Sequence, residues 1–281
     1  MNNSFRMHWG DLAYRDIGRP GNLTLVFIHA MSFHQDIWTD VISHMPSRLR
    51  IVTYDQRGHG ESNVPALPYS LDDYADDAIQ LLDHLELRAC CLVGISFGGL
   101  VAQRVAELRP DLVGRMVLSN TAMKIGVRED WMASANAARA EGFSREKVEA
   151  FFPELFSEAF CQTSLRYEEL LERRVQMSVE GYIGCCQAIG NADFSENART
   201  HPTQPALVIG SDNDVITPPD IVEDLAASLP NGQFKMIESA GHLPCVDKHM
   251  EFADLIVSFL DLPFEVHAAS TGLGASSLGI R

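Results

Sequence analysis

A serine between glycines restricts the possible folds of this chain more than any other feature. The segment Gly94-Ile95-Ser96-Phe97-Gly98 follows an apolar run, Cys90–Val93, and leads into a helical pattern at Gly98–Glu107. A strand that turns sharply into a helix forces an unusual backbone conformation on the serine, and flanking glycines leave room for close packing. The hydroxyl then projects above the carboxyl edge of a sheet, near a helix N-terminus that favours negative charge. Ser96 is therefore the candidate nucleophile.

Apolar, β-branched-rich runs alternate with helical patterns along most of the 281 residues. This alternation predicts an α/β fold, a mostly parallel twisted sheet with helices on both faces. An antiparallel strand is also expected around His8–Asp16. The other predicted strands are Leu23–His29, Arg50–Tyr54, Cys90–Val93, Val113–Leu118, Ala206–Ile209 and Phe234–Ile237. The capping signal Ser70-Leu71-Asp72-Asp73 predicts the start of a helix over 71–85. Further helices are predicted at Gly98–Glu107, Asp220–Ser228 and Lys248–Leu260.

The stretch from about Ile125 to Asn197 interrupts this alternation with helical patterns only. Its predicted helices are Trp131–Glu141, Glu146–Phe156, Tyr167–Met177 and Gly181–Ile189. A helical insertion after the sixth strand suggests a cap over the sheet edge. We therefore expect a core of residues 1–124 and 198–262 and a cap of residues 125–197. Residues 263–281 are rich in Ala, Ser and Gly and are expected to form a loose tail.

Charge and composition exclude several classes of protein. The chain has 38 Asp+Glu against 22 Lys+Arg, which argues against binding to nucleic acid or to an anionic membrane. No secretory signal is apparent, and no apolar run approaches the roughly 20 residues that span a bilayer. The six cysteines, with the adjacent pairs Cys90-Cys91 and Cys185-Cys186, show no metal-ligand spacing. We expect buried free thiols in a cytoplasmic protein, and its oligomeric state stays open.

A serine nucleophile needs a base and a group that orients the base. His242 follows the predicted strand Phe234–Ile237, and the loop after Ala206–Ile209 contains two aspartates, Asp212 and Asp214. Open α/β sheets place their sites at the carboxyl ends of strands. The order Ser96, Asp214, His242 is then the order of a catalytic triad. Asp214 is preferred because Asp212 directly follows the strand, where it can bond local backbone N–H groups.

An oxyanion formed at the substrate needs two N–H donors. Phe97 follows the nucleophile and supplies one, and Met31, in the loop after the strand that ends at His29, supplies the other. His29 and His59 are expected to brace loops rather than to act as bases.

The chain resembles the α/β-hydrolase superfamily over about residues 5–262. Within it, the chain is similar to 3-oxoadipate enol-lactonases. The superfamily resemblance rests on His29-Ala30-Met31, Asp55-x-Arg57-Gly58-His59-Gly60-x-Ser62, Gly94-x-Ser96-x-Gly98-Gly99, Asp212–Asp214 and Gly241-His242. The lactonase resemblance rests on Pro68–Asp73, Leu118-Ser119-Asn120-Thr121-Ala122, Glu129-Asp130-Trp131, Glu180-Gly181-Tyr182-x-x-Cys185-Cys186-x-Ala188-Ile189 and Thr217-Pro218-Pro219.

The resemblance implies a serine hydrolase that opens a lactone in aromatic compound catabolism or cleaves a small carboxylic ester. It implies no metal and no organic cofactor. Carbon–carbon bond hydrolysis, acyl transfer and cofactor-free haloperoxidase-like chemistry on the same triad stay open, as does a non-catalytic ligand-binding module. The partner expected is a small-molecule lactone or ester.

Substrate contacts are expected from the cap. Trp131 is a candidate pocket wall. Acidic residues outnumber basic ones in the cap as in the whole chain, so an anionic substrate would need one specific arginine near Ser96. Arg139 is the first candidate, and the further candidates are Arg145, Arg173 and Arg174. If none of them faces Ser96, a neutral substrate is favoured.

Overall fold

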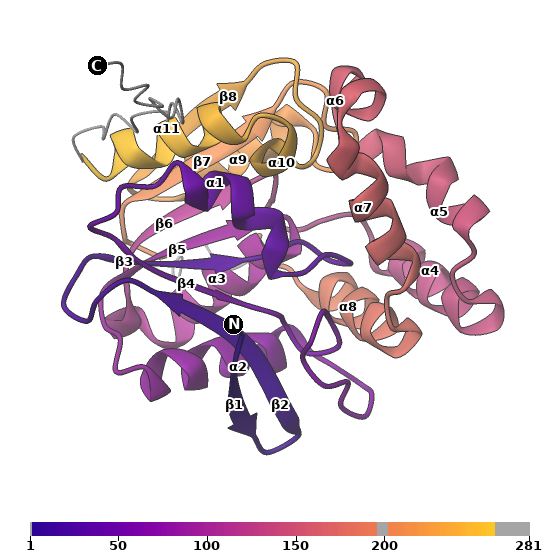
Figure 1. Cartoon of the computed structure of the whole chain (residues 1–281), viewed down its shortest axis with the longest axis horizontal. Coiled ribbons are helices and arrows are strands. Elements are labelled where there is room, and N and C mark those ends of the chain that lie inside the picture. The colour runs from indigo at the N-terminus through magenta and orange to yellow at the C-terminus, as the bar shows by residue number, and fades with distance from the viewer. Residues whose placement is uncertain (1, 196–201, 262–281) are drawn as a thin grey trace, which may run out of the picture.

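A computed structural model describes residues 2–195 and 202–261 and shows one twisted sheet with helices on both faces (Figure 1). The strand order is β1-β2-β4-β3-β5-β6-β7-β8, and every neighbouring pair from β4 to β8 is parallel. The strands are β1 Asn3–Met7, β2 Gly10–Ile17, β3 Thr24–Ile28, β4 Arg50–Tyr54, β5 Cys90–Ile95, β6 Val113–Ser119, β7 Ala206–Ser211 and β8 Gly232–Ile237. This architecture confirms the predicted α/β class.

The expected N-terminal strand is one arm of a hairpin. β1 pairs antiparallel with β2, which in turn pairs antiparallel with β4. The prediction of a single strand around His8–Asp16 was therefore wrong for its first residues, because His8 and Trp9 form the turn between the arms. β1 is a partly exposed edge strand, and its polar residues weaken the apolar signal that would predict it from the sequence.

Two buried clusters of side chains hold the helices to the two faces of the sheet. One cluster joins the sheet to α2, α3 and α9, and the other joins it to α1, α10 and α11. The helices of the core are α1 Thr39–Ser43, α2 Leu71–His84, α3 Phe97–Leu108, α9 Pro219–Ser228, α10 Pro244–Asp247 and α11 His249–Phe259, with the 3-10 helices η1 Gln35–Trp38 and η2 Pro110–Leu112. These helices leave the carboxyl edge of the parallel strands free for loops.

The predicted capping signal of α2 is present as a complete capping box. The backbone N–H of Asp73 donates to Ser70 Oγ over 3.2 Å, and the backbone N–H of Ser70 donates to Asp73 Oδ2 over 2.8 Å. Both bonds satisfy backbone donors that a helix start would otherwise leave unpaired.

A group of helices follows the sixth strand, β6, and precedes β7, as the fold class predicts (Figure 1). These helices, called the cap here, are α4 Arg128–Glu141, α5 Arg145–Phe151, α6 Glu158–Thr163, α7 Leu165–Val175 and α8 Val179–Asn191, with the 3-10 helix η3 Phe152–Leu155. The helix expected at Glu146–Phe156 is divided between α5 and η3, because Pro153 cannot continue an α-helix in its interior. The short helix α6 was not predicted.

The cap contacts the core through two glycines whose backbones touch. A Cβ on Gly181, in α8, would overlap the carbonyl oxygen of Gly58, in the loop after β4. Gly58 also has a positive φ of 76°, which favours glycine. Side chains at either position would push α8 away from the core, so this contact fixes the distance between the cap and the sheet.

Among the described residues, no helix is both long and apolar enough to cross a membrane. All six cysteines are free thiols, and five are buried, whereas Cys161 is partly exposed at the surface of α6. The expectation that all six are buried was wrong for Cys161. The predicted tail, residues 263–281, lies outside the described part of the chain.

Candidate active site

Ser96 lies at the sharp turn between β5 and α3, as the sequence predicts. Its backbone has φ 53° and ψ −120°, a conformation that L-residues rarely adopt. The Ser96 N–H donates to the carbonyl oxygen of Ser119 over 2.9 Å, which fixes the turn to the end of β6. A Cβ on Gly98 would overlap the carbonyl oxygen of Ile28, so the start of α3 packs directly on the end of β3. The strained turn is thus held by backbone contacts on two sides.

The structure brings His242 and Asp214 together from different loops. Asp214 follows β7 and His242 follows β8, and both are buried. His242 Nδ1 lies 2.8 Å from Asp214 Oδ2. Because an ionised carboxylate only accepts hydrogen bonds, Nδ1 carries the proton and Nε2 is left as an acceptor. Ser96 and His242 line the same cavity.

Asp214 is held by four further hydrogen bonds. Its Oδ1 accepts the backbone N–H groups of Ile216, over 2.8 Å, and Thr217, over 3.0 Å. Its Oδ2 also accepts Thr217 Oγ1–H, over 2.6 Å, and Asn120 Nδ2–H, over 2.8 Å. Burial alone would raise the pKa of Asp214, but His242 and these donors outweigh it and hold the pKa below its usual value. The carboxylate is therefore charged and fixed in direction.

Asn120 is the residue in this network that the sequence analysis did not single out. It lies just after β6 with a positive φ of 45° and is fully buried, and its Oδ1 accepts a hydrogen bond from the Ser119 hydroxyl over 2.7 Å. Its amide reaches both Asp214 and Ser211 Oγ, the latter over 3.0 Å. A signal existed, since Leu118–Ala122 is among the segments that carry the lactonase resemblance. No rule of spacing assigns it a role, because its partner lies 94 residues away.

Asp212, the alternative to Asp214, serves the loop and not the histidine. Its Oδ1 accepts the backbone N–H of Ala240 over 3.2 Å and the side-chain amide of Asn213 over 3.0 Å. These bonds join the loop after β7 to the loop after β8, so Asp212 positions the segment that carries His242.

The expected oxyanion donors lie on two sides of Ser96. Phe97 is the first residue of α3, where a helix leaves its backbone N–H without an intrahelical acceptor. Met31, in the loop after β3, lines the same cavity as Ser96. The next residue, Ser32, has a positive φ of 68°, so the loop turns sharply beside the serine.

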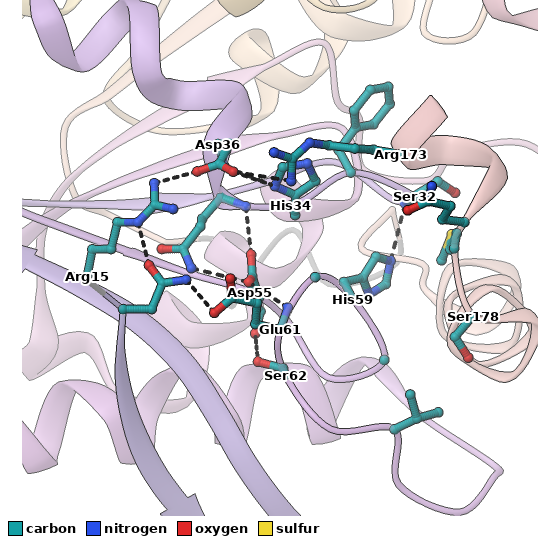
Figure 2. A pocket seen from close by; sticks show the side chains of 18 residues that line it. Arg15, Ser32, His34, Asp36, Asp55, His59, Glu61, Ser62, Arg173 and Ser178 are labelled. Carbon is teal, nitrogen blue, oxygen red and sulfur yellow. Dashed lines mark hydrogen bonds and ion pairs between the residues drawn. The ribbon is translucent and has the colours of Figure 1, made fainter. Parts of the chain in front are cut away.

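Two buried histidines join the loop after β3 to the loop after β4, and the hydrogen bonds of each ring indicate its tautomer. His59 Nε2 accepts the backbone N–H of Ser32 over 3.2 Å (Figure 2), and its Nδ1–H donates to the carbonyl oxygen of Arg57 over 2.9 Å. His29 similarly accepts at Nε2 from the backbone N–H of Gln56, over 3.0 Å. Burial lowers the pKa of both rings to about 3. Both histidines therefore stay neutral and hold loops in place, as expected from the sequence.

The cavity that contains Ser96, called the serine cavity here, has a volume of about 380 Å³. This lies near the lower end of the range of small-molecule sites, about 300–1,000 Å³. The core contributes Met31, Ser96, Ile216 and His242, and the cap contributes Trp131, Ser134, Phe151, Leu155, Arg174 and Tyr182. The Trp131 indole N–H donates to the carbonyl oxygen of Ile125 over 2.6 Å, so its ring is a fixed part of the wall.

The four candidate arginines have different positions. Arg139 is exposed on α4 and does not line the serine cavity, contrary to the expectation for this residue. It lies on the solvent side of a helix whose inner positions are small or aromatic. Arg145 is exposed and pairs with Glu149, Glu168 and Glu172. Arg173 pairs with Asp36 and Glu169, whereas Arg174 lines the serine cavity.

A second cavity, called the polar cavity here, shares Ser32 and Phe33 with the serine cavity and has a volume of about 350 Å³ (Figure 2). Among its charged groups, Asp36 lies between Arg15, His34 and Arg173. His34 and Arg15 hold the pKa of Asp36 well below its usual range. In the polar cavity, His59 Nε2 accepts a backbone N–H and Ser62 Oγ donates to a backbone carbonyl, so both are engaged in holding loops. The serine cavity, with Ser96 and the His242–Asp214 pair in its wall, is the candidate active site. Within the described ranges, no group of three or more His, Cys, Asp or Glu could hold a metal ion.

Comparisons with known proteins agree with this geometry. A family model described as the alpha/beta hydrolase family matches residues 25–255. The chain is 30% identical to 3-oxoadipate enol-lactonase 2 of Acinetobacter baylyi, over 86% of this chain and 90% of the relative. It is 27% identical to the non-heme chloroperoxidase CPO-A1 of Kitasatospora aureofaciens, over 85% of this chain and 88% of that protein.

A solved structure shows the same likeness in three dimensions. The crystal structure of the enol-lactonase from Burkholderia xenovorans LB400 superposes with a TM-score of 0.86 at 27% identity. The match covers 92% of this chain and all of the other.

Proposed function

The chain belongs to the alpha/beta hydrolase family, and from this we propose that it is a serine hydrolase which opens a lactone or cleaves a small carboxylic ester. The observation that carries the proposal is the pairing of His242 with Asp214 at the wall of the cavity that contains Ser96. Membership of the family and the similarity to enol-lactonases support hydrolysis, and the paired histidine supports serine as the nucleophile.

The first step is acylation of Ser96. His242 Nε2 takes the hydroxyl proton while Oγ attacks the substrate carbonyl carbon, and Asp214 stabilises the imidazolium that forms. The backbone N–H groups of Phe97 and Met31 donate to the oxyanion, where removal of one such donor typically lowers kcat by about 10²–10³. The imidazolium then protonates the leaving oxygen as the carbon–oxygen bond breaks.

The second step is hydrolysis of the acyl-enzyme. A water molecule gives its proton to His242 and attacks the acyl carbon, and Ser96 leaves as the free hydroxyl. In a lactone the leaving oxygen stays tethered to the acyl group, so a single product is released. The wall formed by Trp131 and the other cap residues limits the volume available to the acyl chain to that of a small molecule.

The similarity to enol-lactonases favours a lactone over an acyclic ester. The test compares an enol-lactone, followed by loss of its ultraviolet absorbance, with simple p-nitrophenyl esters and with vinylogous diketones. We expect faster turnover of the lactone, with one ring-opened acid as product. A large preference for simple esters would contradict the lactone assignment, and cleavage of the diketones would favour carbon–carbon bond hydrolysis.

The nucleophile is tested separately with Ser96→Ala. We expect a folded protein with no turnover of any of these substrates above the uncatalysed rate. Trapping of a wild-type acyl adduct on Ser96, detected by mass spectrometry after rapid quenching, provides a second measurement. Activity retained in Ser96→Ala would exclude this serine as the nucleophile, and tight binding without turnover in the wild type would indicate a ligand-binding module.

A further inference from the structure

The loop after β8, which carries His242, is in direct contact with the cap on both sides of the histidine. Before it, a Cβ on Gly241 would lie 2.7 Å from the backbone of Phe156, so the two backbones touch. After it, the N–H of Leu243 donates to the carbonyl oxygen of Leu155 over 3.0 Å. The stretch of the cap where η3 ends and α6 begins therefore lies along this loop.

Asp247, the last residue of α10, joins the same two stretches of chain. Its Oδ2 accepts the backbone N–H of Ser157, just before α6, over 2.7 Å, and that of Gly241 over 3.4 Å. The first distance is short and the second is long for an N–H···O hydrogen bond. One carboxyl oxygen thus links the cap segment 155–157 to the residue that precedes His242.

The carboxyl group of Asp247 is costly at this position. Its Oδ1 is buried and has no hydrogen-bond partner among the described residues. Burial raises the pKa of the Asp247 carboxyl, although the N–H groups of Ser157 and Gly241 act in the opposite direction. A buried polar atom without a partner destabilises a folded protein, so stability alone does not account for a carboxyl group here.

The start of the same loop is held by the sheet. The backbone N–H of Ala240 donates to Asp212 Oδ1, and the carbonyl oxygen of Ala240 accepts the N–H of Asn213, each over 3.2 Å. These bonds join the loop to the one after β7, whereas the bonds of Asp247 join it to the cap. His242 therefore lies between an attachment to the sheet and an attachment to the cap.

We propose that Asp247 is a positioning residue for His242, which it holds in place by bonding the histidine loop to the cap segment 155–157. This inference rests on the proposed function, because it concerns the placement of the base that activates Ser96. Asp247 does not line the serine cavity and acts through the backbone of Gly241. Through this one segment the cap contributes to kcat, in addition to forming the wall of the cavity.

The first experiment removes the carboxyl group. Asp247→Ala is compared with Asp254→Ala, a control that removes one carboxylate from an exposed position on α11. Asp247→Asn has nearly the same size and keeps one acceptor oxygen for the N–H of Ser157. For each variant, kcat and KM are measured with the substrate that the wild type prefers among the enol-lactone and the p-nitrophenyl esters.

In Asp247→Ala we expect kcat to fall about 10- to 100-fold at nearly unchanged KM, because a displaced base slows the reaction without loss of a substrate contact. The kcat of Asp247→Asn should lie between this value and that of the wild type, and the kcat of Asp254→Ala should equal that of the wild type. An unchanged kcat in Asp247→Ala would overturn the inference, and so would an equal fall in Asp254→Ala.

The second experiment breaks the same bond from the cap and serves if Asp247→Ala does not fold. Ser157 has φ −66°, and Phe156 before it has φ −134° and ψ 165°, values that suit a proline and the residue before it. Ser157→Pro removes the N–H that Asp247 accepts, whereas Ser157→Ala removes the hydroxyl and keeps this N–H. We expect kcat to be about 10-fold lower in Ser157→Pro than in Ser157→Ala. Equal kcat in the two variants would exclude a role for the bond to the cap.

A spectroscopic measurement separates positioning from stability and from the proposed function. The Nδ1–H of His242, in its bond to Asp214, should give a proton resonance downfield of the backbone amides, assigned by its loss in His242→Gln. We expect this resonance to broaden or move upfield in Asp247→Ala and to stay unchanged in Asp254→Ala. An unchanged resonance in Asp247→Ala, together with a lower urea midpoint, would indicate a purely structural role and overturn the inference. If the wild type turns over none of the substrates, the proposed function fails, and this resonance still decides the role of Asp247.

Discussion

The two sides of the serine cavity are built differently. On the sheet side, Asp214 has five hydrogen bonds, and the buried histidines His29 and His59 join the loop with Met31 to the loop after β4. On the cap side, apolar and aromatic side chains surround Arg174, which forms no ion pair with a described carboxylate. The sheet side thus fixes geometry, and Arg174 is the one charged side chain among the described cap residues that line the cavity.

This difference indicates which property each side controls. A reaction that develops charge at a fixed point requires groups that do not reorganise, and redundant hydrogen bonds provide such rigidity. Discrimination between substrates requires only a difference in binding energy, for which one charged contact suffices. Substitutions on the sheet side should therefore change kcat. Substitutions on the cap side should change the selectivity between substrates or the position of the cap on the sheet.

The largest effect is expected for Asp214→Asn. An amide cannot stabilise the imidazolium of His242 and favours the wrong ring tautomer, so we expect a loss of about 10⁴ in kcat with little change in KM. Steady-state kinetics on the preferred ester measure this loss. Asp212→Asn is the matched control, because Asp212 bonds Ala240 and not the histidine, and should lose far less. A comparable loss of kcat in both variants would mean that the conformation of the loop after β7, and not the carboxylate of Asp214, determines kcat.

Asn120→Ala should have the next largest effect. It removes one donor from Asp214 and leaves the hydroxyl of Ser211 without its partner, so kcat should fall about 10- to 100-fold at unchanged KM. Asn213→Ala, in an exposed position of the neighbouring loop, is the control. A change confined to KM would indicate that Asn120 acts in substrate binding. It would contradict the assignment of kcat to the sheet side and of selectivity to the cap side.

Gly181→Ala tests the contact that seats the cap. The added methyl group would overlap the backbone of Gly58, and we expect the free energy of unfolding to fall by up to about 3 kcal/mol. Urea denaturation measures this fall. Gly190→Ala is milder, since its Cβ would lie 3.2 Å from the Trp131 side chain. Equal stability of Gly181→Ala and the wild type would contradict a tight glycine contact.

His59→Gln tests the rigidity of the sheet side through pH. The folded pKa of about 3 lies below the ordinary 6.5, so the unfolded state binds the proton first. The stability associated with the neutral ring is present above pH 6.5 and is lost as the pH falls towards 3. At pH 5 this loss is about 2 kcal/mol for one histidine. Unfolding curves at pH 7 and 5 should show a correspondingly smaller difference in His59→Gln; an unchanged pH dependence would argue against a buried neutral ring.

Sequence patterns predicted most strands of the sheet because buried parallel strands are continuous apolar runs. β4 has the predicted bounds, and β5 extends the predicted Cys90–Val93 by two residues. The first arm of the N-terminal hairpin and the helix α6 were missed. Both are short and partly exposed, so they lack the apolar periodicity on which such predictions depend.

The sequence by itself determined the α/β class, the strained serine at the turn and the order Ser96, Asp214, His242, because these features depend on local pattern and on position along the chain. Only the tertiary structure showed that His242 meets Asp214, that Asn120 supports this carboxylate from another strand, and that Arg174 rather than Arg139 lines the serine cavity. Contacts between residues far apart in sequence, and the side of a cap helix that faces inward, depend on how the cap packs on the sheet. Local patterns do not encode that packing.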